Sequence, residues 1–253
     1  GGTPTTDEEY AGELTLSPSQ FERALACPLR WFLTTVGADG PSNAAASLGT
    51  LIHAVAEQHP HGTPEELTEA LEARIGELGY NLDTWAGRHS DRRARAIVEN
   101  LASYLVGVPG RVDVEQKVEA QVEGVTIRGR MDRLEYVDEG VRVTDLKTGG
   151  NSDPYRKVDE NAQLAAYQLA LLASGEDVAG ARIALLGTKK KPQTFDQKPL
   201  QGEALAQWRN KVREVAESAR GPYFEARPSD AACAYCSFDR LCPARERGRK
   251  VVE

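Results

Sequence analysis

The chain has 253 residues, of which 40% are hydrophobic and 27% are charged, and its net charge is −7. This length favours one large domain with a sizeable core and leaves no room for both a motor and a separate catalytic domain. The negative net charge argues against a protein that coats nucleic acid along its length. No apolar run approaches about 18 residues and no secretory signal opens the chain, so we expect a cytoplasmic protein without a membrane partner.

The charge is unevenly distributed. Residues 1–87 contain three basic and thirteen acidic residues, a net charge of −10, so the rest of the chain is net positive. Basic clusters lie at residues 92–95, 189–191 and 245–250. Solvated surface faces explain most such clusters. The only methionine is Met131, so we expect this sequence to be part of a longer polypeptide.

A mainly helical part is predicted over residues 16–110, after a polar, acidic linker remnant at residues 1–15. The run Ser17-Pro18-Ser19-Gln20 is typical of a helix start, because Ser17 can cap the helix and Gln20 completes a capping box. Pro28 should break this helix, which ends near residue 33. After a loop at residues 37–46, further helices are predicted over residues 47–58, 63–78 and 90–106.

The hydrophobic period changes from helical to alternating after residue 110. Three or four antiparallel strands are predicted within residues 111–147, with turns at residues 123–124 and 138–140. A helix over residues 161–174, a buried strand over 181–187 and a helix over 203–219 follow. We therefore expect an α/β domain over residues 16–243, with a catalytic core at 111–220, a cysteine-rich tail at 221–243 and a basic tail at 244–253.

A carboxylate–lysine group stands in the strand region. Asp145 and Lys147 share one face at the end of a strand, and Asp132 lies on the preceding strand. Glu115 lies on the strand before that, and His53 comes from the helical part. Neighbouring carboxylates repel one another unless a cation lies between them, and oxygen ligands with one imidazole suit Mg²⁺ or Mn²⁺. This pattern is typical of metal-assisted phosphodiester hydrolysis.

Each of these residues also has an ordinary structural explanation. An Asp-x-Lys triplet at a strand end is often a surface ion pair, and Asp132 between two arginines can form a surface salt bridge. Gln163 and Tyr167 stand four residues apart and share one helix face, although Tyr167 can equally be a core residue and Gln163 a solvent-facing one. The prediction therefore depends on the combination.

Three of the four cysteines lie within ten residues near the C-terminus. They are Cys233, Cys236 and Cys242, and the fourth, Cys27, lies more than 200 residues upstream. A reducing compartment makes disulfides improbable, so metal ligation is the first hypothesis. The spacing alone leaves zinc and an iron–sulfur cluster open.

Several short segments together resemble a known family. They are residues 48–53, Gly129–Arg133, Asp145–Gly149 and 163–167, in that order. They resemble the RecB-like branch of the PD-(D/E)XK nuclease superfamily, which includes nuclease domains of bacterial helicase–nucleases such as AddAB and AdnAB. The resemblance covers about residues 15–243. It implies a restriction-endonuclease-like core, in which helices flank a mixed central sheet.

The resemblance also implies roles for individual residues. His53, Asp132 and Asp145 would bind the metal and Lys147 would be catalytic, while Gln163 and Tyr167 would complete the site and contact the DNA strand. Glu115 matches the family's upstream glutamate less closely, and Asp145 stands where many relatives have glutamate. The four cysteines resemble the iron–sulfur staple of AddB, which favours a [4Fe–4S] cluster over zinc.

The sequence thus predicts a Mg²⁺- or Mn²⁺-dependent DNA nuclease domain, exonuclease-like and acting on single strands during double-strand-break processing. A helicase motor would feed the strands, and it would lie in the parent chain or in a partner subunit because no Gly-x4-Gly-Lys-Ser/Thr loop is present. The alternative is a catalytically silent iron–sulfur module that binds DNA or holds a complex together. The intact set of Asp132, Asp145 and Lys147 favours the nuclease.

Overall fold

The structure of the protein, a computed structural model, describes residues 5–6, 8–38, 48–234 and 236–245. The loop predicted over residues 37–46 lies outside this part of the chain except for its first two residues. In the described residues, no helix is both long and apolar enough to cross a lipid bilayer.

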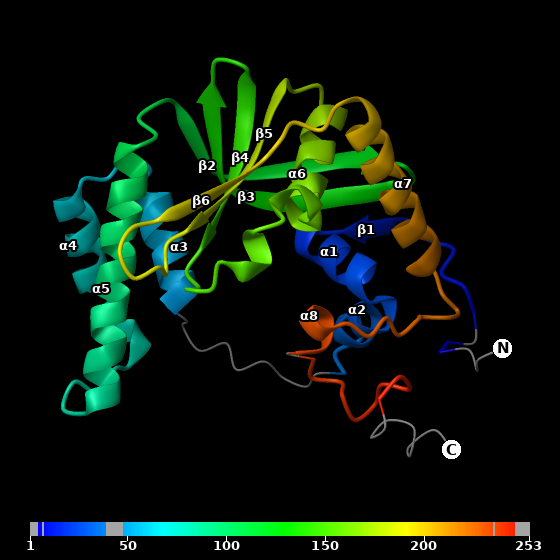
Figure 1. Ribbon diagram of the computed structural model, residues 1–253, viewed down its shortest axis with the longest axis horizontal. Helices are drawn as coiled ribbons and strands as arrows, with labels where there is room; N and C mark the ends of the chain where they lie inside the picture. Colours follow the sequence, from blue (N-terminus) through cyan, green and yellow to red (C-terminus); the bar gives the residue numbers. More distant parts are fainter. Residues whose placement is uncertain (1–4, 7, 39–47, 235, 246–253) are drawn as a thin grey trace.

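The centre of the molecule is a mixed sheet of six strands (Figure 1). The strand order is β1-β3-β4-β5-β6, and β2 pairs with the other edge of β3. Pairing is parallel between β1 and β3 and between β4 and β5, and antiparallel elsewhere. The strands are β1 (Leu14–Leu16), β2 (Val112–Val122), β3 (Val125–Val137), β4 (Gly140–Lys147), β5 (Val178–Leu185) and β6 (Gln193–Gln197).

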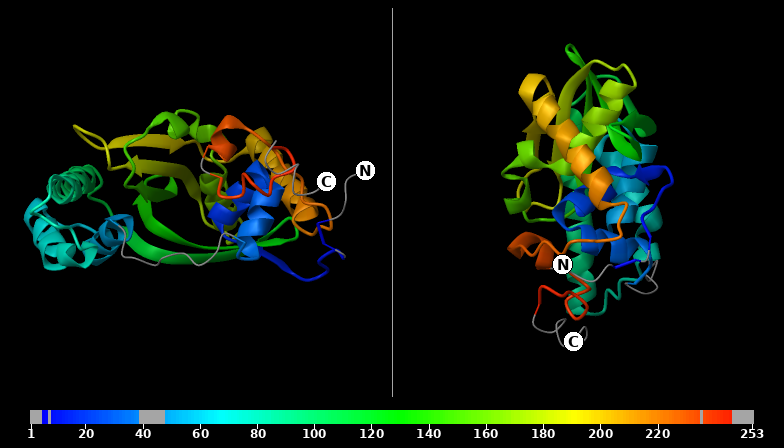
Figure 2. Two further views of the ribbon diagram at one scale, coloured as in Figure 1. Left: turned by 90° about the horizontal axis from the view of Figure 1, so that it is seen from below. Right: turned by 90° about the vertical axis from the view of Figure 1, so that its right-hand side faces the viewer.

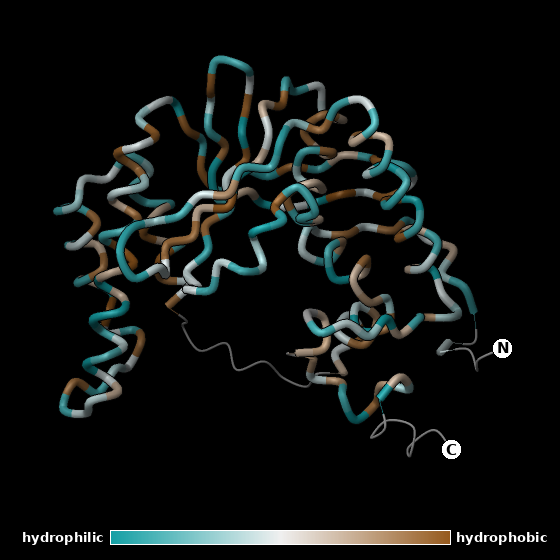
Figure 3. The backbone as a smooth tube through the Cα atoms, viewed as in Figure 1, coloured by the Kyte–Doolittle hydropathy of each residue, from teal (hydrophilic) through white to brown (hydrophobic). Residues whose placement is uncertain are grey.

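Helices flank this sheet and divide the core into two hydrophobic clusters (Figures 1 and 2). One cluster joins the sheet to α1, α2, α6 and α7, and the other joins Leu146 and Ala184 to α3, α4 and α5. The apolar segments lie where strands and helices face one another (Figure 3). The helices are α1 (Pro18–Ala26), α2 (Pro28–Thr35), α3 (Leu48–Gln58), α4 (Pro64–Arg74), α5 (Trp85–Val106), α6 (Ala162–Ala173), α7 (Gly202–Ser218) and α8 (Asp230–Cys233).

Strand β3 is longer than its partners on one edge, and this leaves part of that edge open. β1 pairs with β3 as far as Ile127, and β4 pairs with it from Arg133 onward. No described strand therefore covers residues 128–132 on this edge. Backbone groups there need other partners, and side chains at this point can enter between the strands.

The main features predicted from the sequence are confirmed. Ser17 caps α1 with the expected capping box, and Pro28 ends that helix and begins α2. The meander over residues 112–147 and the helices α6 and α7 form as expected. The α/β class with a mixed sheet flanked by helices is correct.

Three details were wrong. Residues up to 15 were read as a lead-in, yet Leu14–Leu16 form β1, which is too short to show an alternating period. The polar strand β6 was missed because its hydrophobic signal is weak. Helix α5 begins at Trp85 instead of residue 90, because Thr84 caps it.

β1 provides a test of whether this segment belongs to the folded domain. Leu16 is 1% exposed and lies in the core, whereas its neighbour Thr15 is exposed. We expect Leu16→Ala to lower the free energy of unfolding by about 2–5 kcal/mol, because it leaves a cavity in the core. Chemical denaturation of this variant beside Thr15→Ala measures the effect, and equal stabilities for the two would contradict it.

Candidate active site

Three carboxylates occupy corresponding positions on three adjacent strands. Val114 on β2 pairs with Arg133 on β3, so the next position along sets Glu115 opposite Asp132. Arg133 also pairs with Thr144 on β4, and that register brings Asp132 level with Asp145. Like charges opposite one another on neighbouring strands destabilise a sheet. The arrangement therefore needs compensating positive charge.

Asp132 lies where β3 and β4 separate. Its Oδ2 accepts a hydrogen bond from the backbone N–H of Leu146 at 2.7 Å, in place of a strand-to-strand bond. Its Oδ1 lies 3.2 Å from Nδ1 of His53, which α3 contributes. This hydrogen bond to Asp132 raises the pKa of His53 despite the opposing effect of burial. Asp132 thus links the sheet to the helical part.

Glu115 joins His53 and Asp132 in one group. Each of the three offers a ligand atom, and these atoms lie within 4.8 Å of one another. Glu115 has a left-handed φ of 52°, which costs about 1 kcal/mol or more in a non-glycine residue. Arg130 Nη1 lies 3.1 Å from Glu115 Oε2 and balances part of the charge. Two carboxylates and one imidazole form a donor set that suits a hard divalent cation.

Asp145 forms a second, adjoining group with Lys147 and Gln163. The Lys147 ammonium lies 2.7 Å from Asp145 Oδ2, and Gln163 Nε2 donates to Oδ1 at 2.8 Å. Lys147 Nζ also donates to Gln163 Oε1 at 3.3 Å. Burial raises the pKa of Asp145, with Lys147 opposing this. Burial alone would lower the pKa of Lys147, but the attraction of Asp145 outweighs it and the pKa is raised.

Tyr167 lies beside the open edge of β3. Its hydroxyl donates to the carbonyl oxygen of Arg130 at 2.7 Å, which supplies a partner for a backbone group that no strand covers. Desolvation raises the pKa of this phenol, so the hydroxyl keeps its proton. Gln163 and Tyr167 lie on one face of α6, as their spacing predicted, and they contact Asp145 and the backbone of Arg130 respectively.

Two further residues near the site were not predicted. Glu22 on α1 accepts a hydrogen bond from Asn161 Nδ2 at 3.4 Å, and burial raises its pKa while Lys147 opposes the rise. Tyr155 follows β4, and burial raises its pKa while Lys147 again opposes the rise. The only sequence feature that could have indicated a place for Glu22 near the site is its position as an acidic residue on a partly buried face of an amphipathic helix.

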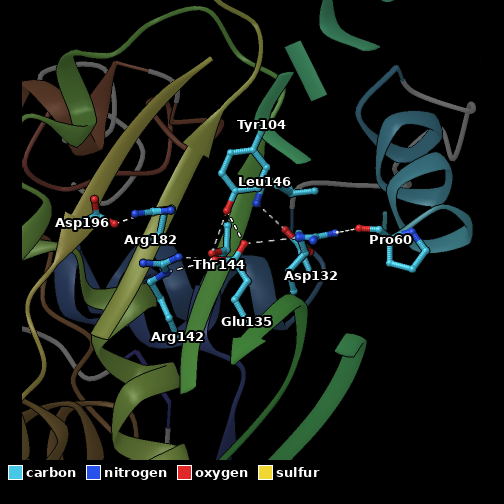
Figure 4. Close-up of polar contacts among 10 residues, drawn as sticks. Pro60, Tyr104, Asp132, Glu135, Arg142, Thr144, Leu146, Arg182 and Asp196 are labelled. Carbon is cyan, nitrogen blue, oxygen red and sulfur yellow. Dashed lines mark hydrogen bonds and ion pairs between the residues drawn. The ribbon is translucent and has the colours of Figure 1, made fainter. Parts of the chain in front are cut away.

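A buried polar network supports the strand that carries Asp132 (Figure 4). Glu135, 3% exposed, accepts hydrogen bonds from the hydroxyl of Tyr104 and from Arg142, whose Nη2 lies 2.9 Å from Oε2. The fully buried Arg133 has its Nε 3.6 Å from Glu135 Oε1, and its Nη1 donates to the carbonyl of Pro60 at 3.1 Å. Pro60 follows α3 closely, so this network connects β3 to the helix that carries His53.

The cysteines lie in a different region. Cys27 joins α1 to α2, and its thiol lies 3.9 Å from the carbonyl of Glu225 in the tail. Arg30 Nη1 donates to the carbonyl of Ala232 at 2.8 Å, which holds α8 beside α2 (Figure 1). No three of the four described sulfur atoms come within 4.8 Å of one another. The tail thus returns to the first helices, as the cysteine pattern predicted, without gathering the thiols at one point.

Comparison with known proteins places this geometry in context. A family model described as PD-(D/E)XK nuclease superfamily matches residues 15–243. The "Gene 69 protein" of Mycobacterium phage D29 is 26% identical over 267 residues, covering 90% of this chain and 96% of that protein. A crystal structure from Eubacterium rectale, of a protein described as a "Putative exonuclease", aligns with a TM-score of 0.50 at 12% identity, covering 92% of this chain and 94% of the other.

The buried network yields a stability prediction. Glu135→Ala should lower the free energy of unfolding by about 3–5 kcal/mol, because it leaves the buried guanidinium of Arg133 without its carboxylate. Chemical denaturation measures this. The control is Glu119→Ala on β2, whose carboxylate pairs with Arg128 on the exposed surface, where a comparable loss is not expected. A similar small change in both variants would contradict the prediction.

Proposed function

The chain belongs to the PD-(D/E)XK nuclease superfamily, and we propose that it is a metal-dependent deoxyribonuclease that hydrolyses phosphodiester bonds. The observation that carries this proposal is the convergence of His53, Glu115 and Asp132, with Asp145 and Lys147 adjoining them. Carboxylates held opposite one another across strands need a cation, and a lysine beside them suits an anionic substrate.

In this proposal His53, Asp132 and Asp145 hold Mg²⁺ or Mn²⁺, and Glu115 contributes to the same group. Such an ion, when bound, activates water and neutralises charge on the phosphate. Asp132 can serve because its Oδ2 is fixed by the N–H of Leu146, which leaves Oδ1 directed at His53. His53 would hold such an ion as the neutral imidazole, because only that form is a ligand.

Lys147 and Gln163 act on the substrate side. The ammonium of Lys147 cannot ligate a cation, so its role is to donate hydrogen bonds to phosphate oxygens and to the attacking water. Asp145 and Gln163 hold that ammonium from two sides at 2.7 and 3.3 Å, which fixes its position before the substrate arrives. The hydroxyl of Tyr167 donates to the carbonyl of Arg130 and so keeps the open edge of β3 in place. In the proposal, Tyr167 also borders the path of the DNA strand.

We further propose an exonuclease-like action on single strands of DNA, in a protein of the RecB-like branch that works with a helicase motor. The sequence segments that resemble this branch support it, and the description of the Eubacterium rectale protein as a "Putative exonuclease" agrees with the exonuclease-like action.

The cysteines support a structural metal group in the same proposal. Cys27, Cys233, Cys236 and Cys242 would bind a [4Fe–4S] cluster, with zinc as the second candidate. Contacts of Cys27 and α2 with the tail already hold these segments together. A metal group bound by all four thiolates would link them through coordination bonds as well. A tail with little apolar surface gains folding free energy from such a bond.

The nuclease proposal is tested by separating metal binding from chemistry. Asp132→Asn should lose both Mn²⁺ affinity, measured by calorimetry, and cleavage of labelled single-stranded DNA, because a ligand charge is removed. Lys147→Ala should lose cleavage by about 100-fold or more while Mn²⁺ affinity stays close to that of the unmodified protein, because the ammonium acts only on substrate.

The matched control is Glu119→Gln, four residues from Glu115 on the same strand, where the carboxylate pairs with Arg128 away from the site. It should retain both metal binding and cleavage. A chain that binds DNA but cuts none with any divalent metal would instead support the silent iron–sulfur module.

The cluster proposal has its own experiment. Protein purified without oxygen should absorb visible light and contain iron in proportion to sulfide, and Cys27→Ala and Cys242→Ala should each lose that absorbance. Both variants should also become more sensitive to proteolysis in α1 and in the tail after Gly221, because in the proposal the same metal group holds both segments. Stoichiometric zinc without visible absorbance would overturn the iron–sulfur assignment.

A further inference from the structure

One face of helix α5 presents an exposed tryptophan in line with cationic side chains. Trp85 is 71% exposed. Arg88, His89 and Arg92 follow it at three, four and seven residues, a spacing that places all four side chains on one helix face. The three are also exposed. We call these four residues the α5 platform.

The charges of this platform are available to a ligand. Arg95, one turn further along, is paired with Asp91 at 3.2 Å and with Glu72 at 2.8 Å. Among the ion pairs of the described residues, none involves Arg88 or Arg92. Arg88 Nη1 donates to the carbonyl of Leu82 at 2.9 Å, which orients the guanidinium without neutralising it. The platform is therefore positive in a chain whose net charge is −7.

The exposure of Trp85 sets it apart from the other tryptophans. Trp31 and Trp208 are 6% and 4% exposed and belong to the core. The ring of Trp85 stacks on that of His89, with centroids 5.3 Å apart and an angle of 11° between the planes. The imidazole therefore covers one face of the indole, and the high exposure of Trp85 leaves the rest of the ring accessible to solvent. A rigid aromatic face beside unpaired arginines is the arrangement that binds single-stranded nucleic acid.

We propose that the α5 platform binds single-stranded DNA, with one base stacked on Trp85 and phosphates on Arg88 and Arg92. This inference rests on the proposed nuclease function and adds a second contact for the same strand, away from the carboxylates. Unpaired guanidinium groups match a polyanion, whereas a protein partner would need either acidic or mainly apolar complementarity at this face.

Contacts along α5 connect the platform to the candidate active site. Asn100 lies eight residues, or about 12 Å, beyond Arg92 on the same helix. Its Nδ2 donates to the carbonyls of Leu186 at 2.7 Å and Thr188 at 3.0 Å, which holds the turn between β5 and β6 against α5. Figure 1 shows this turn beside the middle of α5, with the first turns of the helix extending beyond it.

That turn carries Lys189, Lys190 and Lys191, all exposed. At its base, the N–H of Leu186 donates to the carbonyl of Lys147 at 2.7 Å. These contacts connect α5, through the lysine turn, to the strand end that carries the catalytic lysine of the proposal. A strand bound at Trp85 would follow this route to the carboxylates.

The test measures DNA binding in EDTA, where cleavage is blocked, with a fluorescein-labelled oligothymidylate and the full chain. Binding should quench the fluorescence of Trp85, since the other two tryptophans are buried. Trp85→Ala should weaken the affinity by about 5- to 100-fold, whereas Trp85→Phe should keep most of it because a phenyl ring still stacks. Arg92→Ala should reduce the salt dependence by about 0.7 in log–log slope.

The control is Val106→Ala, a residue 72% exposed at the other end of α5, which should bind like the unmodified chain. Equal affinity of Trp85→Ala and Val106→Ala, or fluorescence that DNA does not change, would overturn the platform even if the protein cuts DNA normally. Conversely, weakened binding by Trp85→Ala in a chain that cuts nothing supports the platform and refutes the nuclease proposal, so the two failures are distinguishable.

Discussion

The central physical constraint on this molecule is the repulsion between Glu115, Asp132 and Asp145, which three neighbouring strands hold at the same level of the sheet. Each carboxylate has a separate partner, since Arg130 contacts the first, His53 the second and Lys147 the third. These partners come from a strand, a helix and a strand end. Two of these partners belong to the sheet itself and only His53 comes from a helix, so the site is complete only when α3 packs against the sheet.

The support behind the site follows the same logic. The open edge of β3 lets the side chain of Asp132 enter between strands. It also leaves backbone N–H and C=O groups of β3 without hydrogen-bond partners on a neighbouring strand. Tyr167 supplies one of the missing partners, and the N–H of Leu146 finds another in Asp132 itself. On the opposite side, Glu135 and Arg133 sit in the core, where only mutual pairing and hydrogen bonds make burial of charge tolerable. The rigidity of the site therefore depends on buried groups that touch no substrate.

Part of the candidate site could be predicted from the sequence, because some of its residues follow patterns that extend over only a few neighbouring positions. Alternation along β4 gave the shared face of Asp145 and Lys147, and a spacing of four gave Gln163 and Tyr167 on one face of α6. Other features depend on tertiary structure. The left-handed backbone of Glu115 and the approach of Glu22 arise from pairing and packing between distant segments, and no periodicity encodes them. For the same reason β1, with three residues, could be recognised only once β3 was there to pair with it.

The pairing of β1 with β3 has a consequence for the order of folding. Leu14 lies beside Val125, so this contact closes a loop of 111 residues, whereas β2, β3 and β4 are joined by tight turns. Contacts between distant residues form slowly because loop closure costs entropy, so we expect the β2–β4 meander to form early and β1 to dock late. During synthesis, β1 emerges from the ribosome before its partner β3, and it would then be among the last strands of the sheet to pair. Until it does, residues 125–127 of β3 also lack a partner on that edge and can pair with other chains, which raises the risk of aggregation during folding.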